Sequence, residues 1–408
     1  MVKKWISLLL ILVLSLFFLS GCYDARGLET LAYAVAIGLD KGESNLLKLS
    51  IQFASSGSSS QGGASSQYTD TTVATVECSS VESGINLVNS YMSKKVNLSH
   101  CKIIVLSETL AKEGVAPYIS TFENSTEVRP DCNIIVSRCS AESFLNSSSP
   151  GLETLSARYY ELVLTSSEYT GYTDNITLHS FFFAYDNDFI EATAILGGIN
   201  SDKTHREDLN TAYVSVDGNY KADETPIQNT TSLENMGLAV FRGDKLVGEL
   251  TGIESLSHLM VTNTFVSSNI TIPSPFAQNE IIDLSITKNK DTKNEIELVN
   301  GYPYIKSSIN LEAYVLSSGN NLDFTQEKNL QLLEKYSESY LKDKITSYLY
   351  KTSKEFHSDI VGFGRKLSKN YLTIKDFKAL DWLNIYKNSF FEVDVTVHVR
   401  SSQLILKD

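Results

Sequence analysis

The residue whose surroundings most directly predict chemistry is Cys22, the last member of a Leu-Ser-Gly-Cys run at residues 19–22. Lys3 and Lys4 give the chain a positive start, and residues 6–19 are almost wholly apolar, which is the order of parts in an export signal. A helix that spans a bilayer needs about 20 apolar residues, so this stretch is too short to cross comfortably. We therefore expect a signal segment that ends just before the thiol of Cys22.

The order of two small residues and then a cysteine resembles the bacterial lipoprotein signal, in which the cysteine thiol receives diacylglycerol before cleavage. We expect residues 1–21 to be the lipoprotein signal peptide and Cys22 to be the lipidation site and the mature N-terminus. An ordinary secretory signal and a core helix with a chance cysteine are the alternatives. Two acyl chains suffice for stable anchoring, because each buried methylene adds roughly 0.8 kcal/mol of membrane affinity. The body would then stay on a membrane surface.

The remaining sequence offers no pattern typical of catalysis or metal binding. Motifs of zinc enzymes, serine hydrolases and phosphate-binding loops are all missing from the sequence, and none of the histidines has metal-ligand spacing. His357 and Asp359 predict a solvated helix end rather than a catalytic pair, and residues 362–364 predict a tight packing turn. We expect no catalytic residue, no metal site and no cofactor. The histidines are His100, His179, His205, His258, His357 and His398.

Four cysteines remain once Cys22 is assigned: Cys78, Cys101, Cys132 and Cys139. None forms a C-x-x-C pair, and so few cysteines in a long chain do not indicate a disulfide scaffold. We expect buried free thiols. Cys101 and Cys132 both begin predicted strands, so they form the only pair that we expect could bond.

Composition limits the class of protein and its partners. The chain has 408 residues, of which 42% are hydrophobic and 20% charged, so it is globular in composition with room for two or three domains. The formal charge is −13, and it becomes −15 when Lys3 and Lys4 leave with the signal. This charge repels nucleic acid and anionic lipid headgroups, and we expect no nucleic-acid partner.

The first half alternates between strand and helix patterns. Two continuous apolar runs, at residues 103–105 and 134–136, are typical of strands covered on both faces, and each is followed by a helix pattern. We expect an α/β-type domain with a mixed sheet over residues 22–218. Its other predicted elements are strands at 32–39, 46–53, 72–78, 193–198 and 212–216, a helix from residue 80, helix over 151–189 and a flexible loop at 55–66.

The second half is predicted to be an α+β domain over residues 236–408, after a surface linker at 219–235. An amphipathic helix is predicted at 326–355, with a core face against a sheet as the preferred interpretation and a partner-binding helix as the alternative. Alternating valines at 393–399 predict a half-buried strand. The whole chain is therefore classed as α+β. Further elements are expected as a hairpin at 237–250, a helix at 252–260 and strands at 280–286, 295–299 and 304–316.

Several segments together resemble one family, the Ger(x)C lipoproteins, which are the C subunits of nutrient germinant receptors in endospore-forming bacteria. The resemblance covers essentially the whole chain and depends on the order and spacing of its pieces. The chain departs from the family at Tyr23, where Trp is usual, at residues 26–29 and in its enlarged loop at 55–66. The matching pieces are Cys22-Tyr23-Asp24, residues 36–42, 99–114, 237–241, 244–248 and 359–364 ahead of Trp382, and the closing valine strand.

The resemblance implies a non-catalytic subunit of a spore germinant receptor, needed for nutrient-triggered germination. It implies a lipid anchor on the outer face of the spore inner membrane and two integral membrane subunits as partners, with germinant recognition mainly in those subunits. Two other hypotheses stay open. One is a lipid-anchored extracytoplasmic solute-binding protein with a cleft between the halves, and the other is a hydrolase with carboxylates that the sequence does not reveal.

Overall fold

The computed structural model describes most of the chain. The predicted strand at 212–216 and the predicted loop at 55–66 lie outside the described residues, as does Cys22. Every structural statement below concerns the described residues, which are 3–7, 15, 28–43, 46–54, 72–147, 156–200, 218–227, 232–318, 322–324 and 326–400.

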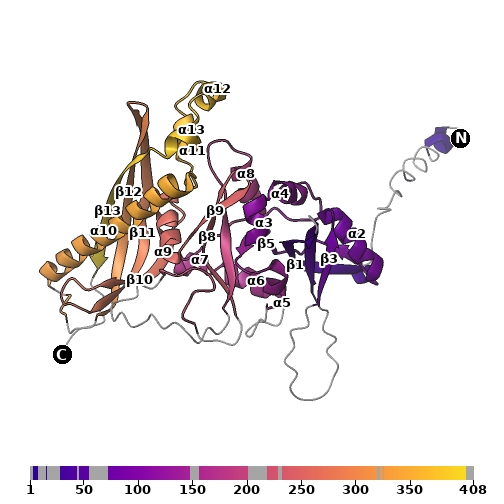
Figure 1. Cartoon of the computed structure of the whole chain (residues 1–408), viewed down its shortest axis with the longest axis horizontal. Helices are drawn as coiled ribbons and strands as arrows, with labels where there is room; N and C mark the ends of the chain where they lie inside the picture. The colour runs from indigo at the N-terminus through magenta and orange to yellow at the C-terminus, as the bar shows by residue number, and fades with distance from the viewer. Residues whose placement is uncertain are drawn as a thin grey trace, which may run out of the picture.

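A mixed sheet forms the first half of the described structure, with nine strands in the order β3-β2-β1-β5-β6-β7-β8-β9 and β4 beside β1 (Figure 1). The central strands β1, β5, β6 and β7 run parallel, and antiparallel strands flank them on both sides. The strands are β1 (Leu31–Lys41), β2 (Leu47–Phe53), β3 (Thr72–Cys78), β4 (Lys95–Asn97), β5 (Ile103–Ser107), β6 (Asn133–Ser137), β7 (Thr193–Asn200), β8 (Ser232–Arg242) and β9 (Lys245–Leu250).

Helices follow the central strands because the apolar runs of β5 and β6 need cover on both faces. Every residue of β5 is buried. The helix predicted over 151–189 is three helices, since Gly171 ends α7 in the left-handed conformation and the Thr177 side chain caps α8. The helices are α2 (Val81–Tyr91), α3 (Glu108–Glu113), α4 (Ala116–Glu123), α5 (Ala141–Asn146), α6 (Ser156–Leu164), α7 (Ser167–Thr170) and α8 (Leu178–Tyr185).

The hairpin of β8 and β9 lies between two hydrophobic cores. We expected it to open the second half, but β8 pairs antiparallel with β7 and so extends the first sheet. Because side chains alternate along a strand, Ala239 and Phe241 belong to the first core, whereas Leu238 and Val240 belong to the second. The hairpin therefore holds the two halves together through a shared strand.

A separate four-stranded sheet forms the second half, in the order β10-β11-β12-β13. The first three strands are antiparallel, and β13 runs parallel to β12. The strands predicted at 280–286 and 295–299 are one strand, because the polar residues between them stay paired with β12, with shifts of register. The strands are β10 (Ser267–Pro273), β11 (Ile281–Val299), β12 (Tyr302–Ser318) and β13 (Phe390–Arg400).

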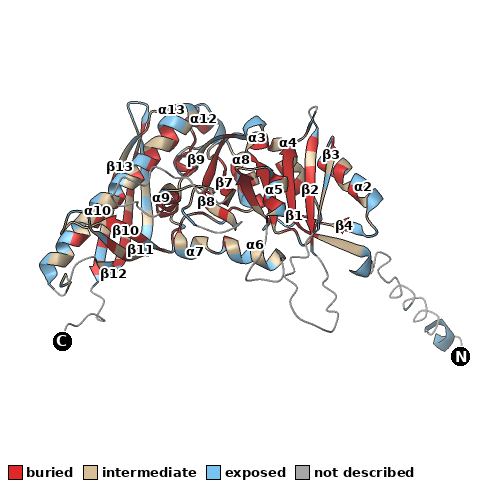
Figure 2. Cartoon of the chain, turned by 60° about the horizontal axis from the view of Figure 1, so that its bottom comes forward, coloured by how far each residue is buried: buried red, intermediate tan, exposed pale blue. Residues whose placement is uncertain are grey.

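The long helix α10 (Glu327–Tyr350) packs on β13 and on α9 (Gly252–Thr262). Its side chains Leu333, Leu341 and Ile345 are buried, which confirms the core-face interpretation of the amphipathic pattern. Figure 2 shows buried residues along only one side of this helix. A π-helical turn (Lys351–Phe356) follows, and then three short helices, α11 (Phe363–Ser368), α12 (Ile374–Lys378) and α13 (Trp382–Tyr386).

Candidate functional site: the junction between the two halves

The predicted lipidation site Cys22 lies outside the described residues, so its lipidation stays a prediction. Among the described residues, no helix has the length and apolar character needed to cross a membrane. The same part of the chain has no group of three His, Cys, Asp or Glu residues arranged to hold a metal ion. The most connected polar groups lie where the two halves meet.

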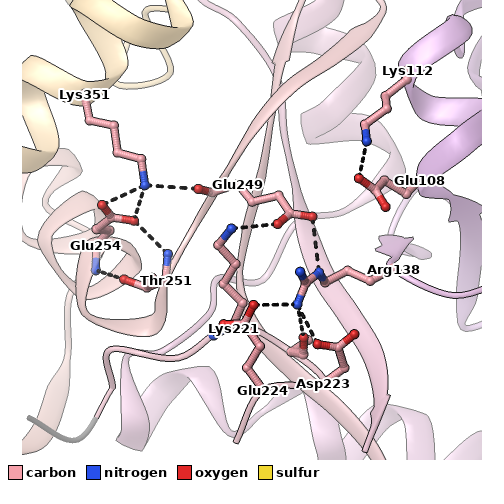
Figure 3. Close-up of polar contacts among 11 residues, drawn as sticks. Glu108, Lys112, Arg138, Lys221, Asp223, Glu224, Glu249, Thr251, Glu254 and Lys351 are labelled. Carbon is pink, nitrogen blue, oxygen red and sulfur yellow. Dashed lines mark hydrogen bonds and ion pairs between the residues drawn. The ribbon is translucent and has the colours of Figure 1, made fainter. Parts of the chain in front are cut away.

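Arg138 is the centre of the first polar cluster and comes directly after β6 (Figure 3). Its Nη1 donates to Asp223 Oδ1 at 2.5 Å and to Glu224 Oε1 at 3.0 Å, and its Nε lies 3.5 Å from Glu249 Oε1. Burial lowers the pKa of Arg138, but the charges of Glu249, Asp223 and Glu224 outweigh it and raise the pKa above its ordinary value. Residues 222–224 of the predicted surface linker are thus held against the end of β6, and Ala222 is fully buried.

A chain of contacts leads from Arg138 to the end of α10. Lys221 Nζ donates to Glu249 Oε2 at 2.9 Å, and the backbone oxygen of Glu249 accepts from Lys351 Nζ at 3.3 Å. Lys351 also donates to both carboxylate oxygens of Glu254, each at 2.8 Å. Glu254 in turn accepts from the backbone N–H of Thr251 at the start of α9. The network therefore connects β6, β9, α9 and the end of α10, as Figure 3 shows.

A second cluster surrounds Asp359, which is fully buried. Oδ1 accepts from the backbone N–H of Gly362 at 2.9 Å and of Phe363 at 3.1 Å, and Oδ2 accepts from Gly364 N and Trp382 Nε1, both at 2.8 Å. Burial raises the pKa of Asp359 to about 6, while the four donors lower it. Our prediction of a solvated helix end at His357 and Asp359 was wrong, because this carboxylate caps the start of α11 from inside the core.

The glycines of this turn are required by its geometry, as the predicted packing turn implies. Gly362 has φ +78°, a conformation that L side chains rarely adopt. A Cβ on Gly364 would lie 2.4 Å from atoms of the Trp382 ring, and that approach leaves no space for a side chain. The two glycines allow three backbone N–H groups and one indole to converge on Asp359.

The Asp359 cluster is also bonded to the first sheet. The backbone oxygen of Asp359 accepts from Glu191 N at 3.0 Å, and Ser358 Oγ donates to Phe241 O at 2.6 Å. Glu191 Oε2 accepts from Gly243 N at 2.7 Å in the turn between β8 and β9. Burial raises the pKa of Glu191 to about 7, with a smaller contribution from the charge of Asp359. The loop after α10 and the β8–β9 hairpin are therefore fixed to each other.

A cavity of about 300 Å³ lies on the other side of Arg138, where β1, β5 and β6 end. The carboxyl ends of parallel strands are a common place for ligands. Here Asp40 accepts from the N–H groups of Ala141 and Glu142 at 2.8 and 2.9 Å, and Lys48 pairs with Glu142 at 2.5 Å. These charges are already neutralised within the chain. The cavity is lined by Asp40, Lys41, Lys48, Ser107, Glu108, Thr109, Arg138, Cys139 and Ser140.

The side chains of His258 and of the described cysteines pack within the fold. His258 is buried with its Nδ1 2.7 Å from the Tyr348 hydroxyl, and burial lowers the pKa of His258 to about 4. The four described cysteines are free thiols, as expected, and Cys139 is the half-buried member. Cys101 and Cys132 are within reach of each other, with 3.7 Å between their sulfur atoms. Burial raises the pKa of Cys132 well above its ordinary value, which disfavours the thiolate form.

These contacts define a structural junction between the two halves of the chain. In fold, the chain matches the crystal structure of the GerBC protein with a TM-score of 0.54 and 16% identity, over 92% of this chain and 99% of that one. The two sheets and their helices therefore have the α+β fold of the GerBC protein.

Family models then match both halves. Residues 24–199 match the spore germination protein N-terminal domain, and residues 236–403 match the spore germination B3/GerAC-like C-terminal domain. The chain therefore belongs to the Ger(x)C family of spore germination proteins, as the resemblance in its sequence implies.

Two curated relatives come from Bacillus subtilis (strain 168). Spore germination protein KC is 24% identical over 91% of this chain and 89% of its own length. Putative spore germination protein YfkR is 21% identical over 97% of this chain and 95% of its own length. Both relatives span nearly the whole chain, so the similarity covers both halves and the junction between them.

Proposed function

We propose that this chain is the lipid-anchored, non-catalytic C subunit of a spore germinant receptor and is needed for nutrient-triggered germination. It is held through acylated Cys22 on the outer face of the spore inner membrane and binds two integral membrane subunits. The observation that carries the proposal is the ordered match of both germination domains, at 24–199 and 236–403. The export signal and the cysteine that ends it support the membrane location.

The junction supports a scaffold role for the subunit. A solute-binding protein that closes around its ligand needs a hinge at which two domains move apart. Here β8 supplies side chains to both cores, and Lys351, Ser358 and Asp359 of the second half bond to Glu249, Phe241 and Glu191 of the first sheet and the chain before it. These contacts resist a movement of the two halves away from each other. A rigid two-part body suits a subunit that presents fixed surfaces to partners.

The proposal is tested by affinity purification of the tagged protein from membrane extracts of spores. Wild type is compared with Cys22→Ala and with the control Cys139→Ala, which removes a half-buried thiol of the body. We expect two integral membrane proteins to be recovered with wild type and with the control, and to be lost or weakened with Cys22→Ala. Recovery of wild-type protein without membrane partners would contradict the proposal.

The solute-binding alternative has one observation in its favour, the cavity of about 300 Å³ at the ends of β1, β5 and β6. It predicts saturable binding of an amino acid to the body. Calorimetry with candidate amino acids, on wild type and on Ser107→Leu, tests it, because Ser107 lines the cavity and a larger side chain would fill it. Heat that saturates with wild type and disappears in the variant would favour the alternative over the receptor subunit.

A further inference from the structure

The described body begins at one end of the molecule, where α2 and β4 also lie. β4 runs parallel to the first residues of β1, with Leu31 beside Lys95. Figures 1 and 2 show α2 at this end and α10 at the opposite end of the longest axis. Leu28, the first described residue of the body, is six residues after Cys22, a length of chain that spans at most about 20 Å. An acylated Cys22 therefore keeps this end close to the bilayer.

One flank of α2 carries large apolar side chains near that end. Leu87 is 48% exposed and Tyr91 is 77% exposed, and their spacing of four residues puts them on the same side of the helix. This flank borders the side of α2 that buries Val81 and Val88 in the core. An exposed apolar residue by itself needs no explanation. Tyrosine beside leucine next to a lipid anchor is different, because tyrosine is enriched where protein meets the membrane interface.

Two lysines follow α2 along the chain, and Lys95 begins β4. Lys94 and Lys95 are both exposed, and neither forms an ion pair with a carboxylate of the described chain. The exposed acidic residues of this region are Glu29, beside the start of β1, and Glu82, in the first turn of α2. The whole chain carries a formal charge of −13, and two adjacent exposed lysines differ from that general trend. Lysines near a bilayer surface are attracted to anionic headgroups.

We propose that Leu87, Tyr91, Lys94 and Lys95 form a membrane-contact patch that lies on the headgroups of an anionic bilayer. The inference rests on the proposed lipid anchor, which brings the patch to the surface. The acyl chains set the distance between the body and the bilayer, and the membrane-contact patch sets the orientation of the body. The aromatic and apolar side chains of the patch enter the membrane interface, and its lysines pair with lipid phosphates. The second sheet then faces away from the bilayer, at the far end of the longest axis (Figure 1).

The test uses the full acylated chain in vesicles made of equal parts phosphatidylglycerol and phosphatidylcholine, with phosphatidylcholine vesicles for comparison. A water-soluble amine reagent is applied, and acetylation of each lysine is followed by mass spectrometry. We expect Lys94 and Lys95 to react about fivefold more slowly in the anionic vesicles than in the neutral ones, because paired and interfacial amines are shielded. Lys335, exposed on α10 at the far end, should react equally in both.

A matched pair of variants keeps the test specific. Tyr91→Ser should restore the reactivity of Lys94 and Lys95, whereas Tyr169→Ser, which alters a tyrosine that is 62% exposed on α7, should not. Equal reactivity of the two lysines in all vesicles, on a chain whose mass shows the diacylglyceryl group, would overturn the membrane-contact patch and leave the receptor role intact. A chain recovered from its native membrane without that group would overturn both.

Discussion

The central strands of the first sheet are buried along nearly their whole length, whereas the strands of the second sheet alternate between buried and accessible positions. Every residue of β5 is buried, while β12 and β13 repeat buried and accessible side chains. Figure 2 shows the same contrast. A parallel sheet needs helices on both faces, and a sheet with one covered face can leave the other in water. The first sheet is thus covered on both faces, and the second sheet leaves a polar face accessible to water.

The junction between them repeats this contrast on a smaller scale. The Arg138 cluster is a partly accessible network of ion pairs, and the Asp359 cluster is a single carboxylate with four donors inside the core. The first kind of contact contributes little when water can replace it, whereas loss of a partner from the second leaves buried polar groups unpaired. All four donors to the Asp359 carboxylate belong to the second half, so we expect the buried cluster to contribute more to the stability of that half.

The largest expected effect follows from Asp359→Asn. Asparagine has a nitrogen in place of one carboxylate oxygen, and that nitrogen cannot accept a hydrogen bond. Gly364 N and Trp382 Nε1 both donate to Oδ2, so replacing this oxygen leaves two buried donors without their acceptor. We expect a loss of about 3–5 kcal/mol in the free energy of unfolding, measured in urea. Asp343→Asn, on the exposed side of α10, is the control and should change it little. A loss below about 1 kcal/mol for Asp359→Asn would remove the contrast between the clusters.

The second prediction concerns how the free energy of unfolding depends on pH at the same junction. Burial raises the pKa of Glu191 to about 7 from an ordinary value of 4.5, so the folded state holds this proton more tightly than the unfolded state. The contribution of Glu191 to stability is therefore present below pH 4.5 and is lost as pH rises to 7, by an amount on the order of 3 kcal/mol. Asp359, whose pKa is raised to about 6, acts in the same direction.

Glu191→Gln should make the free energy of unfolding less dependent on pH over this interval, because the amide carries no charge to bury. Urea unfolding at several pH values measures the change. Glu297→Gln, at an exposed position of β11, is the control and should leave the wild-type slope unchanged. If the free energy of unfolding depended on pH identically in wild type and Glu191→Gln, Glu191 would not be buried in the junction.

The third prediction concerns four substitutions that test the two sheets themselves. Ile104→Thr and Val105→Thr alter neighbouring positions of β5 that are both fully buried, so each should cost about 1–3 kcal/mol. On β13, Val397→Thr should cost a similar amount, but His398→Thr should be nearly neutral because His398 is exposed. Thermal unfolding of the four variants measures this. Equal losses at Val397 and His398 would mean that both faces of the second sheet are covered.

The smallest effect is expected at the ion-pair network. Arg138→Lys keeps the charge but loses the planar group that reaches Asp223, Glu224 and Glu249 together, so we expect a loss of about 1 kcal/mol. Arg158→Lys, at an exposed surface pair, should change the urea midpoint little. If Arg138→Lys cost as much as Asp359→Asn, the ranking of the two clusters would be wrong.

The sequence predicts those elements whose pattern depends on local burial. The valines of β13 alternate because one face is buried, and the apolar runs of β5 and β6 are continuous because both faces are covered. The amphipathic pattern of α10 likewise predicts its packing. Together with the motif series, these patterns were enough to predict the α+β class and the family, both of which are confirmed.

The junction could not be predicted because its partners are far apart along the chain. Arg138 and Glu249 are separated by more than a hundred residues, and no local pattern pairs them. Asp359 looked solvated beside His357 and the charged end of the long helix. A usable signal was present in Gly362 and Gly364, since a carboxylate shortly before two glycines is typical of a cap on a tight turn.

The role of β8 shows a different limit. Its apolar residues 237–241 predict a strand, and they also fit a strand that is buried on both faces. The pattern does not indicate that the two faces belong to different cores, because that depends on which sheet the strand joins. Domain limits at 22–218 and 236–408 therefore stay predictions, with a strand that both halves share.

The central claim is that this chain is a receptor subunit that acts from the membrane through Cys22. The most direct measurement is the germination of spores that lack the gene and any paralogue, complemented with wild type or with Cys22→Ala and exposed to nutrients. We predict that wild type restores the response and that Cys22→Ala does not. Spores without the gene that germinate as fast as the wild-type complement would contradict the claim.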